Sequence, residues 1–107
     1  MYIYKIYFST DVDYKHTNKL ISELETLFLN NGINLDGFTI IKTNGYYKEN
    51  ALDGIGEIEK SYILEYIVNE NSYFLMTDDY IKRISKLIKG YYNQKEVLTT
   101  KQLTNIL

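Results

Sequence analysis

Two apolar runs separated by a polar tract, within residues 37–68, constrain the fold of this chain more than any other feature. The runs are Phe38–Thr43 and Tyr62–Val68, and both are rich in β-branched and aromatic residues, which favour strands. The tract between them begins with Asn44–Tyr47 and contains two further glycines, a composition typical of turns. The sequence therefore predicts a β-hairpin with a long loop.

The segments on either side of this hairpin complete an order of six elements. Tyr2–Phe8 alternates with the period of a strand, and two later segments repeat apolar residues at helical spacing. Asn31-Gly32 is a typical stop for the first helix, and Thr77 is a typical cap for the second. The expected elements in chain order are a strand at Tyr2–Phe8, a helix from about His16 to Asn30, a strand from near Phe38, a strand from about Glu59 to Val68, a helix from Thr77 to Gly90 and a short strand at Glu96–Leu103.

This order is the split β-α-β arrangement of ferredoxin-like domains, an α+β fold in which two helices cover one face of a four-stranded antiparallel sheet. We expect residues 1–107 to form a single domain, since a second core would leave each half near the lower size limit for folding. The run Tyr62–Val68 has apolar residues on both faces, whereas a sheet wetted on one side alternates cleanly. A homo-oligomer, with a dimer as first choice, is therefore expected to cover the open face.

Composition excludes several classes of function. The chain has no cysteine, one histidine and a formal charge of −2, so no disulfide framework, thiolate metal site or cysteine nucleophile is possible, and neither a metal nor a cofactor is expected. The mild charge argues against a general grip on nucleic acid. No apolar run is long enough to span a membrane, and a cytoplasmic protein is expected. The abundance of Lys, Asn, Ile and Tyr suggests a low-GC bacterium or one of its phages.

Two other groups of polar residues have simple structural interpretations. His16 precedes the first helix among polar residues, where a surface or capping role is expected. The second helix has a basic outer face, which is typical of solvated surface and leaves anion or acidic-partner binding as the alternative. That face consists of Lys82, Arg83, Lys86 and Lys89.

The candidate binding site lies where the hairpin tract meets its strands and where the second helix ends. The chain has 12 tyrosines, and tyrosine combines a stacking face with a hydroxyl and few torsions to freeze. Turn and strand propensity alone could also account for the tract. The two segments need not touch within one subunit, although they can meet across subunits. The candidate ligand-binding residues are Gly45, Tyr46, Tyr47, Lys48, Glu59, Lys60, Ser61, Tyr92 and Gln94.

Three short stretches resemble elements of a family of small bacterial, plasmid and phage proteins of unknown function. They are Tyr4-Lys-Ile-Tyr-Phe8, the Gly45-x-Tyr47 step followed by Glu59-Lys-Ser61, and Tyr92-Asn-Gln94-Lys-Glu-Val97-Leu98. Tyr47 stands where this family often has tryptophan. The predicted topology is also similar to that of PII-type signal proteins, whose ferredoxin-like domains bind nucleotides at the base of a long loop. The glycine-rich nucleotide loop of PII-type proteins is absent here.

These observations predict a non-enzymatic protein of phage or mobile-element origin. We expect it to bind or sequester a small anionic or nucleotide-like ligand. The alternative is a protein-binding inhibitor of a bacterial defence system, of the anti-CRISPR type. An enzyme is not expected, because the sequence shows no nucleophile with a credible base and no catalytic residue is assigned. Glu59 beside Tyr47 could act in acid-base chemistry only if burial raised the pKa of the carboxyl group toward neutrality.

Overall fold

A computed structural model describes residues 1–10, 16–47, 57–68 and 77–105. Within these residues the order is strand, helix, strand, strand, helix, strand, which confirms the predicted ferredoxin-like α+β arrangement. The elements are β1 (Tyr2–Ser9), α1 (Thr17–Asn30), β2 (Thr39–Tyr47), β3 (Glu57–Val68), α2 (Thr77–Tyr91) and β4 (Leu98–Leu103).

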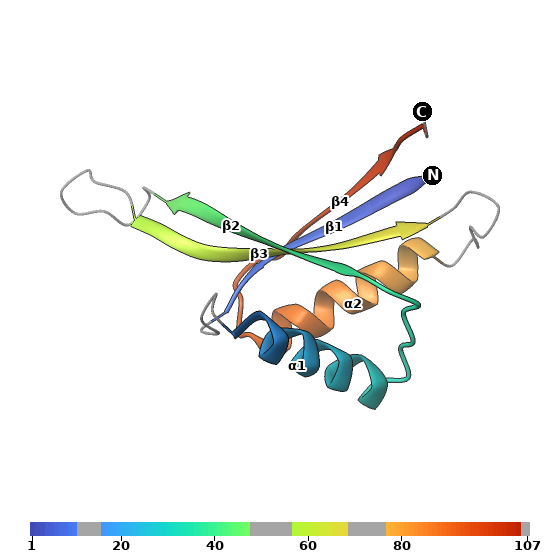
Figure 1. The fold of residues 1–107 in the computed structure, drawn as a ribbon, viewed down its shortest axis with the longest axis horizontal. Coiled ribbons are helices and arrows are strands. Elements are labelled where there is room, and N and C mark those ends of the chain that lie inside the picture. The colour runs from blue at the N-terminus through green and yellow to red at the C-terminus, as the bar shows by residue number, and fades with distance from the viewer. Residues whose placement is uncertain (11–15, 48–56, 69–76, 106–107) are drawn as a thin grey trace.

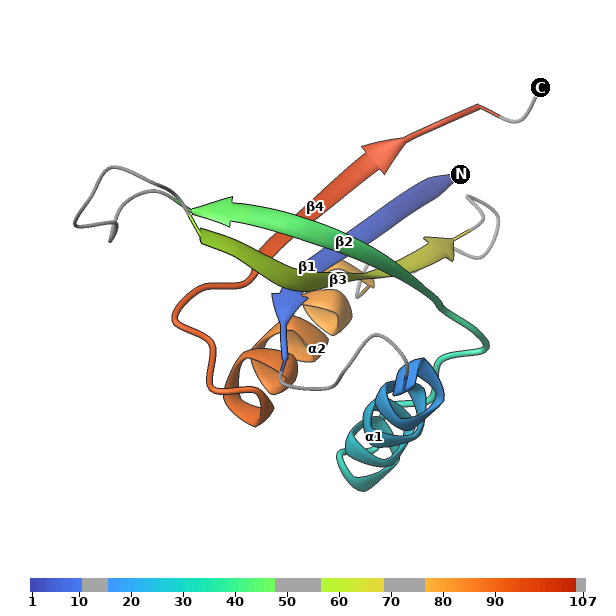
Figure 2. The same cartoon turned by 60° about the vertical axis from the view of Figure 1, so that its left-hand side comes forward.

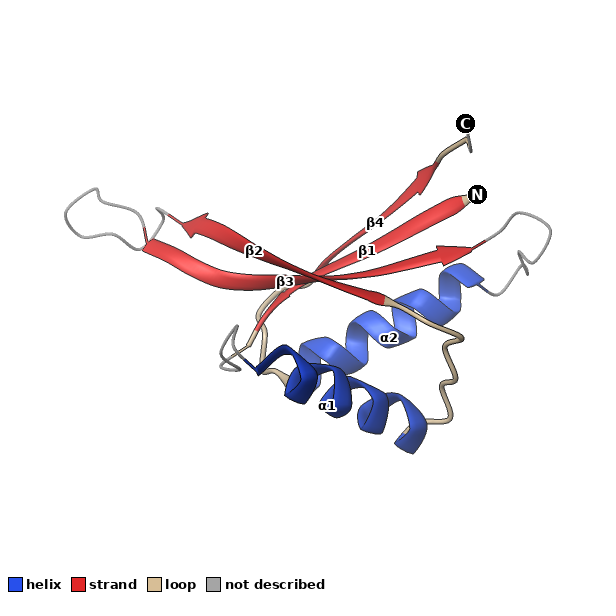
Figure 3. Ribbon diagram, viewed as in Figure 1, coloured by secondary structure: helices blue, strands red, loops and turns tan. Residues whose placement is uncertain are grey.

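The four strands form one antiparallel sheet in the order β2-β3-β1-β4, with β1 and β3 at its centre. Both helices lie on the same side of this sheet, and no described helix covers the other side, called here the open face (Figure 1 and Figure 3). The start of β1 and the end of β4 lie near each other at one end of the sheet. The N–H of Thr104 donates to the carbonyl of Met1 at 2.9 Å there. The β2–β3 arms extend past the helices at the opposite end (Figure 1).

The core lies between the sheet and the two helices. Even-numbered residues of the central strands, such as Ile6, Phe8 and Leu64, are buried against the helices, as strand alternation requires. The helices contribute residues at spacings of three and four, as predicted. The helical core residues are Leu20, Leu24 and Phe28 of α1 and Ile81, Ile84 and Ile88 of α2.

The hairpin arms are longer than the sequence predicted. Gly45, Tyr46 and Tyr47 belong to β2, and β3 begins at Glu57, so part of the predicted loop is strand. These positions pair across the hairpin, with Gly45 opposite Glu59, Tyr46 opposite Ile58 and Tyr47 opposite Glu57. Pairing of the two backbones therefore outweighs the local turn chemistry of Asn44-Gly45.

The end of α2 also differs from the prediction. Tyr91 continues the helical spacing of Ile84 and Ile88, which predicts that it is buried, but its side chain is 53% exposed, and the helix ends at Tyr91 rather than at Gly90. The residue with a left-handed backbone is Asn93, at φ 52°, which turns the chain so that Tyr92 packs on the core instead. The end of α1 follows the prediction, with Gly32 at φ 70°.

Candidate functional site

The hairpin arms bring several predicted site residues to paired positions. Gly45 lies opposite Glu59, and Thr43 lies opposite Ser61. Asn44 lies opposite Lys60 in the same ladder. The backbone positions predicted on the two arms are therefore neighbours across the hairpin, while Lys48 lies outside the described residues.

Ser61 connects the hairpin to the end of β1. Its hydroxyl lies 3.3 Å from that of Ser9, and both side chains are buried. Ser9 and Ser61 are a cross-strand pair at the last position of the β1–β3 ladder. The contact places one predicted site residue at the junction of the two central strands.

Gln94 reaches the same junction from the turn after α2. The N–H of Ser9 donates to Oε1 of Gln94 at 3.1 Å, and Nε2 of Gln94 donates to the carbonyl of Tyr92 at 3.2 Å. Figure 2 shows the chain between α2 and β4 close to the carboxyl end of β1. Three predicted site residues, Ser61, Tyr92 and Gln94, thus lie close together within one chain. The sequence had left open whether these segments meet within one subunit or between two.

Tyr92 is held by contacts on three sides. Its ring stacks on Phe8 with centroids 5.5 Å apart and meets Tyr91 edge-on at 4.8 Å. Its hydroxyl donates to Oε2 of Glu23 on α1 at 3.1 Å. Burial raises the pKa of Tyr92 far above its usual value, and the hydrogen bond to Glu23 raises it further. Tyr92 is therefore a protonated donor at neutral pH that fixes the end of α2 to α1.

A cavity of about 490 Å³ opens beside Tyr92, between α1 and the end of α2. Its wall combines a lysine, a carboxylate, two amides and two tyrosine rings. The lining residues are Thr10, Lys19, Glu23, Tyr91, Tyr92, Asn93 and Gln94. It is widely open to solvent, and its lining is more polar than apolar. This cavity and the predicted residues Tyr92 and Gln94 together form the candidate site.

Sequence reasoning missed the part of this wall that α1 supplies. Lys19 and Glu23 are four residues apart and share one helical face, a spacing that is typical of a solvated surface pair. Only the packing of α1 against the turn after α2 gives them a common cavity. The available signal was the i, i+4 opposite-charge pair itself, which is too common to identify a site.

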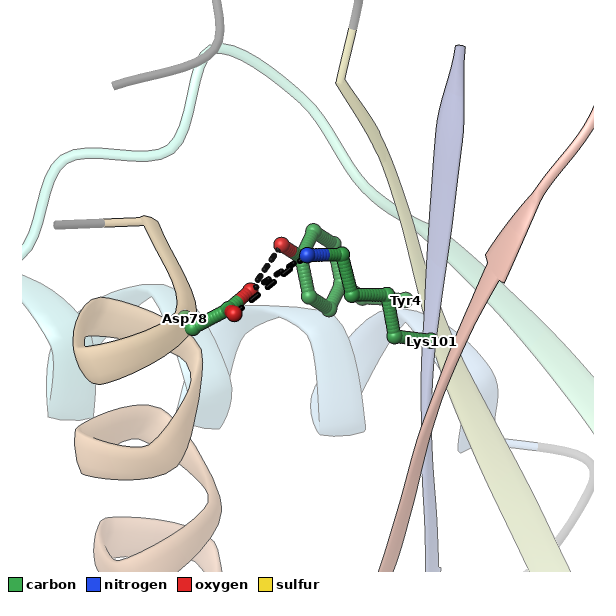
Figure 4. Close-up of polar contacts among 3 residues, drawn as sticks. All are labelled: Tyr4, Asp78 and Lys101. Carbon is green, nitrogen blue, oxygen red and sulfur yellow. Dashed lines mark hydrogen bonds and ion pairs between the residues drawn. The ribbon is translucent and has the colours of Figure 1, made fainter. Parts of the chain in front are cut away.

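A second polar cluster lies at the other end of α2 (Figure 4). The hydroxyl of Tyr4 donates to Oδ1 of Asp78 at 2.5 Å, and Nζ of Lys101 lies 3.1 Å from the same carboxylate. Nζ of Lys101 also lies 4.5 Å from the ring centroid of Tyr2. We call these residues the Asp78 cluster; they connect the start of α2 to β1 and β4.

Other candidate groups form no site in the described part of the chain. The basic side chains on the outer face of α2 are exposed, and Nη2 of Arg83 donates to the carbonyl of Asn31 at 2.6 Å. His16 is exposed at the start of α1 without a side-chain cap bond. Within the described ranges, no three His, Cys, Asp or Glu side chains are grouped so that they could hold a metal ion. Likewise, no described helix is long and apolar enough to cross a membrane.

Comparison with known proteins finds similarity in structure only. No protein-family model matches the sequence, and no curated protein matches it significantly. The fold is similar to that of a phage SAM lyase in complex with S-methyl-5′-thioadenosine, with a TM-score of 0.69 and 17% identity over 94% of this chain and 79% of the lyase. The apo state of a phage SAM lyase matches with a TM-score of 0.70 and 14% identity, over 94% and 78% of the two chains.

A PII-like signalling protein from Thermus thermophilus is matched with a TM-score of 0.42 and 19% identity, over 94% of this chain and 83% of that chain. The lyases that share this fold are phage proteins, and a phage origin of this chain itself stays a prediction. The resemblance to a family of unknown function finds no family model. The alternative of a protein-binding inhibitor is tested by none of these matches and stays a prediction.

One prediction about activity is wrong. The sequence led to a non-enzymatic protein, whereas the phage SAM lyase that shares this fold is an enzyme. That prediction relied on the missing pair of a nucleophile and a base. The inference was too broad, because a lyase breaks a bond without hydrolysis and needs no serine or cysteine nucleophile.

Proposed function

We propose that this protein binds S-adenosylmethionine and cleaves it to release S-methyl-5′-thioadenosine. The observation that carries the proposal is the extent of the fold likeness to the phage SAM lyase, which includes 94% of this chain at a TM-score of 0.69. The cavity at the end of α2 supports it independently, since it offers a small molecule both aromatic and charged groups.

The wall of the cavity suits the parts of S-adenosylmethionine. The exposed ring of Tyr91 offers a face for the adenine ring or for the sulfonium cation. The amide of Asn93 can form hydrogen bonds with the ribose hydroxyls. Glu23 and Lys19 provide one charge of each sign for the amino and carboxylate groups of the methionine part. The proposed roles of these residues are binding and orientation.

Cleavage of S-adenosylmethionine requires little acid-base catalysis from the protein. When the bond from sulfur to the methionine γ-carbon breaks, its electron pair goes to sulfur, and the sulfonium leaves as a neutral thioether. The four-carbon fragment is completed in one of two ways: a base removes the β-proton to form an alkene, or the substrate's own carboxylate bonds to the γ-carbon to form a lactone. The second route needs no protein base, and positioning the carboxylate near the γ-carbon is enough to favour it.

The test is product analysis by mass spectrometry after incubation with S-adenosylmethionine. We expect S-methyl-5′-thioadenosine together with either the lactone or the alkene, which identifies the route. S-Adenosylhomocysteine is the matched control, because its sulfur carries no charge and is a poor leaving group, so it should stay intact. Absence of product, together with no thermal shift by either S-adenosylmethionine or S-methyl-5′-thioadenosine, would overturn the proposal.

A further inference from the structure

Glu23 lies on the cavity wall with one of its two carboxylate oxygens bound by the protein. Oε2 accepts the hydroxyl of Tyr92 at 3.1 Å, and no hydrogen bond or ion pair joins Oε1 to the described part of the chain. Lys19 precedes Glu23 by one helical turn and lines the same cavity, yet these two described side chains form no ion pair with each other. Both charges are therefore available to a ligand in the cavity.

Tyr92 restricts the position of this carboxylate. Its ring stacks on the buried Phe8 and meets Tyr91 edge-on, so the hydroxyl has little freedom to move. Because burial raises the pKa of Tyr92 well above its usual value, the hydroxyl stays protonated at neutral pH and donates to Glu23. The carboxylate is thus held in place before a ligand binds, and less side-chain entropy is lost on binding.

An ammonium group suits this carboxylate better than the sulfonium does. The methionine part of S-adenosylmethionine has an amino group and a carboxylate on one carbon, and Glu23 and Lys19 offer the opposite charges one helical turn apart. An ammonium has three N–H donors, whereas a sulfonium has none, and a carboxylate oxygen binds a charged donor most strongly. The sulfonium has the exposed ring of Tyr91 as another contact.

We propose that Glu23, positioned by the hydroxyl of Tyr92, recognises the α-amino group of the methionine part and makes the cavity specific for ligands with an amino acid end. The inference rests on the proposed function, because it assigns one group of S-adenosylmethionine to this wall. The product S-methyl-5′-thioadenosine lacks that end, so the same contact favours substrate over product. Glu23 acts by binding, and Tyr92 is a positioning residue that acts through Glu23.

The test is isothermal titration calorimetry with S-adenosylhomocysteine, which carries the amino acid end but is not cleaved, and with its analogue in which hydrogen replaces the amino group. We expect the natural sequence to bind S-adenosylhomocysteine about tenfold more tightly than the analogue. Glu23→Gln should abolish this preference, and Tyr92→Phe, which keeps the stacked ring, should reduce it. Glu25→Gln is the matched control, because Glu25 is an exposed carboxylate of α1 outside the cavity wall.

The outcomes separate this inference from the proposed function. If S-adenosylmethionine is cleaved but Glu23→Gln keeps the preference for the amino group, the inference is wrong and the proposed function stands. A fall in Glu23→Gln only in the preference for S-adenosylmethionine over S-adenosylhomocysteine would assign Glu23 to the sulfonium and overturn the inference too. Equal affinities of the natural sequence for S-adenosylhomocysteine and the analogue overturn it without any variant. Protein that neither cleaves S-adenosylmethionine nor binds S-adenosylhomocysteine overturns both proposals.

Discussion

The two ends of α2 are both fixed to the rest of the molecule by a tyrosine hydroxyl on a carboxylate, but they differ in what surrounds that bond. At the start of the helix, Tyr4 donates to Asp78 and Lys101 pairs with the same carboxylate. At the end of the helix, Tyr92 donates to Glu23, and the cavity opens beside the pair. The polar groups of the Asp78 cluster bind one another, whereas those at the end of α2 line a cavity.

We infer from this difference that the Asp78 cluster stabilises the fold and that the groups at the end of α2 bind a ligand. The tyrosine-carboxylate bond alone does not mark a site, since it occurs at both ends. What distinguishes the end of α2 is the additional exposed ring of Tyr91 together with Lys19 and the amides of the turn. Substitutions at the two ends should therefore differ in kind: those at the Asp78 cluster should lower stability alone, and those on the cavity wall should lower binding and turnover.

The largest loss of stability is expected for Phe8→Ala. Phe8 is buried and stacks on both Tyr62 and Tyr92, with centroids 6.0 and 5.5 Å apart, so its removal leaves a cavity under the end of α2. A buried phenylalanine changed to alanine costs about 3 to 5 kcal/mol of unfolding free energy. Urea unfolding measures this, and Phe8→Leu should lose clearly less. Equal losses for the two variants would contradict the cavity as the main cause of the effect.

Asp78→Ala is expected to come next. It leaves the hydroxyl of the buried Tyr4 without this carboxylate and removes the ion pair with Lys101, a loss of about 1.5 to 3 kcal/mol for a hydrogen bond to a charged group. Asp79→Ala is the matched control, because the neighbouring Asp79 is exposed and lies in the same first turn of α2. If both variants unfolded at the same urea concentration, the dipole of the helix rather than the Asp78 cluster would explain the effect.

Gln94→Ala should cost about 1 to 2 kcal/mol, since it leaves the N–H of Ser9 without its amide acceptor. Thermal unfolding is a sufficient measurement, with Lys95→Ala, an exposed neighbour in the same turn, as the control. A melting temperature of Gln94→Ala equal to that of Lys95→Ala would show that Gln94 does not hold the turn against β1.

The smallest effect concerns pH and Tyr92. Folding holds the pKa of this tyrosine above its usual value of about 10. The stability that the protonated hydroxyl provides is therefore complete below about pH 10 and is lost as pH rises through the raised folded pKa. Tyr92→Phe should lower the unfolding free energy by about 1 kcal/mol at neutral pH and should lose less than the natural sequence on going to about pH 11. Parallel slopes for the two proteins would contradict the assignment.

The sequence predicted the layers of the fold well, because each depends on a local period. Alternation in Tyr2–Phe8 and helical spacing in α1 and α2 identify which face of each of these elements is apolar, and burial then follows. Tyr62–Val68 is apolar on both faces, so its sequence indicated a strand without showing which face is buried. The predicted ends of strands and helices were less accurate where contacts with distant segments determine them. β2 continues through Tyr46 because the backbones of β2 and β3 pair there, and a local reading of Asn44-Gly45 does not include that pairing.

The candidate site was predicted only in part, for the same physical reason. Tyr92 and Gln94 were identified as a recognition group, and the left-handed Asn93 brings them to the end of β1. The contribution of α1 was missed because Lys19 and Glu23 show no pattern beyond that of a polar helix face. A site between segments distant in sequence becomes visible only when the packing of those segments is known.

The most direct test of this account compares turnover of S-adenosylmethionine in variants at the two ends of α2. Tyr91→Ala removes the exposed ring from the cavity wall and should lower kcat/KM by about tenfold or more with little change in stability. Asp78→Asn, which keeps an oxygen acceptor for Tyr4, should leave kcat/KM unchanged even where it lowers the melting temperature. Unchanged turnover in Tyr91→Ala, or a loss in Asp78→Asn as large as that in Tyr91→Ala, would contradict the placement of the site at the end of α2.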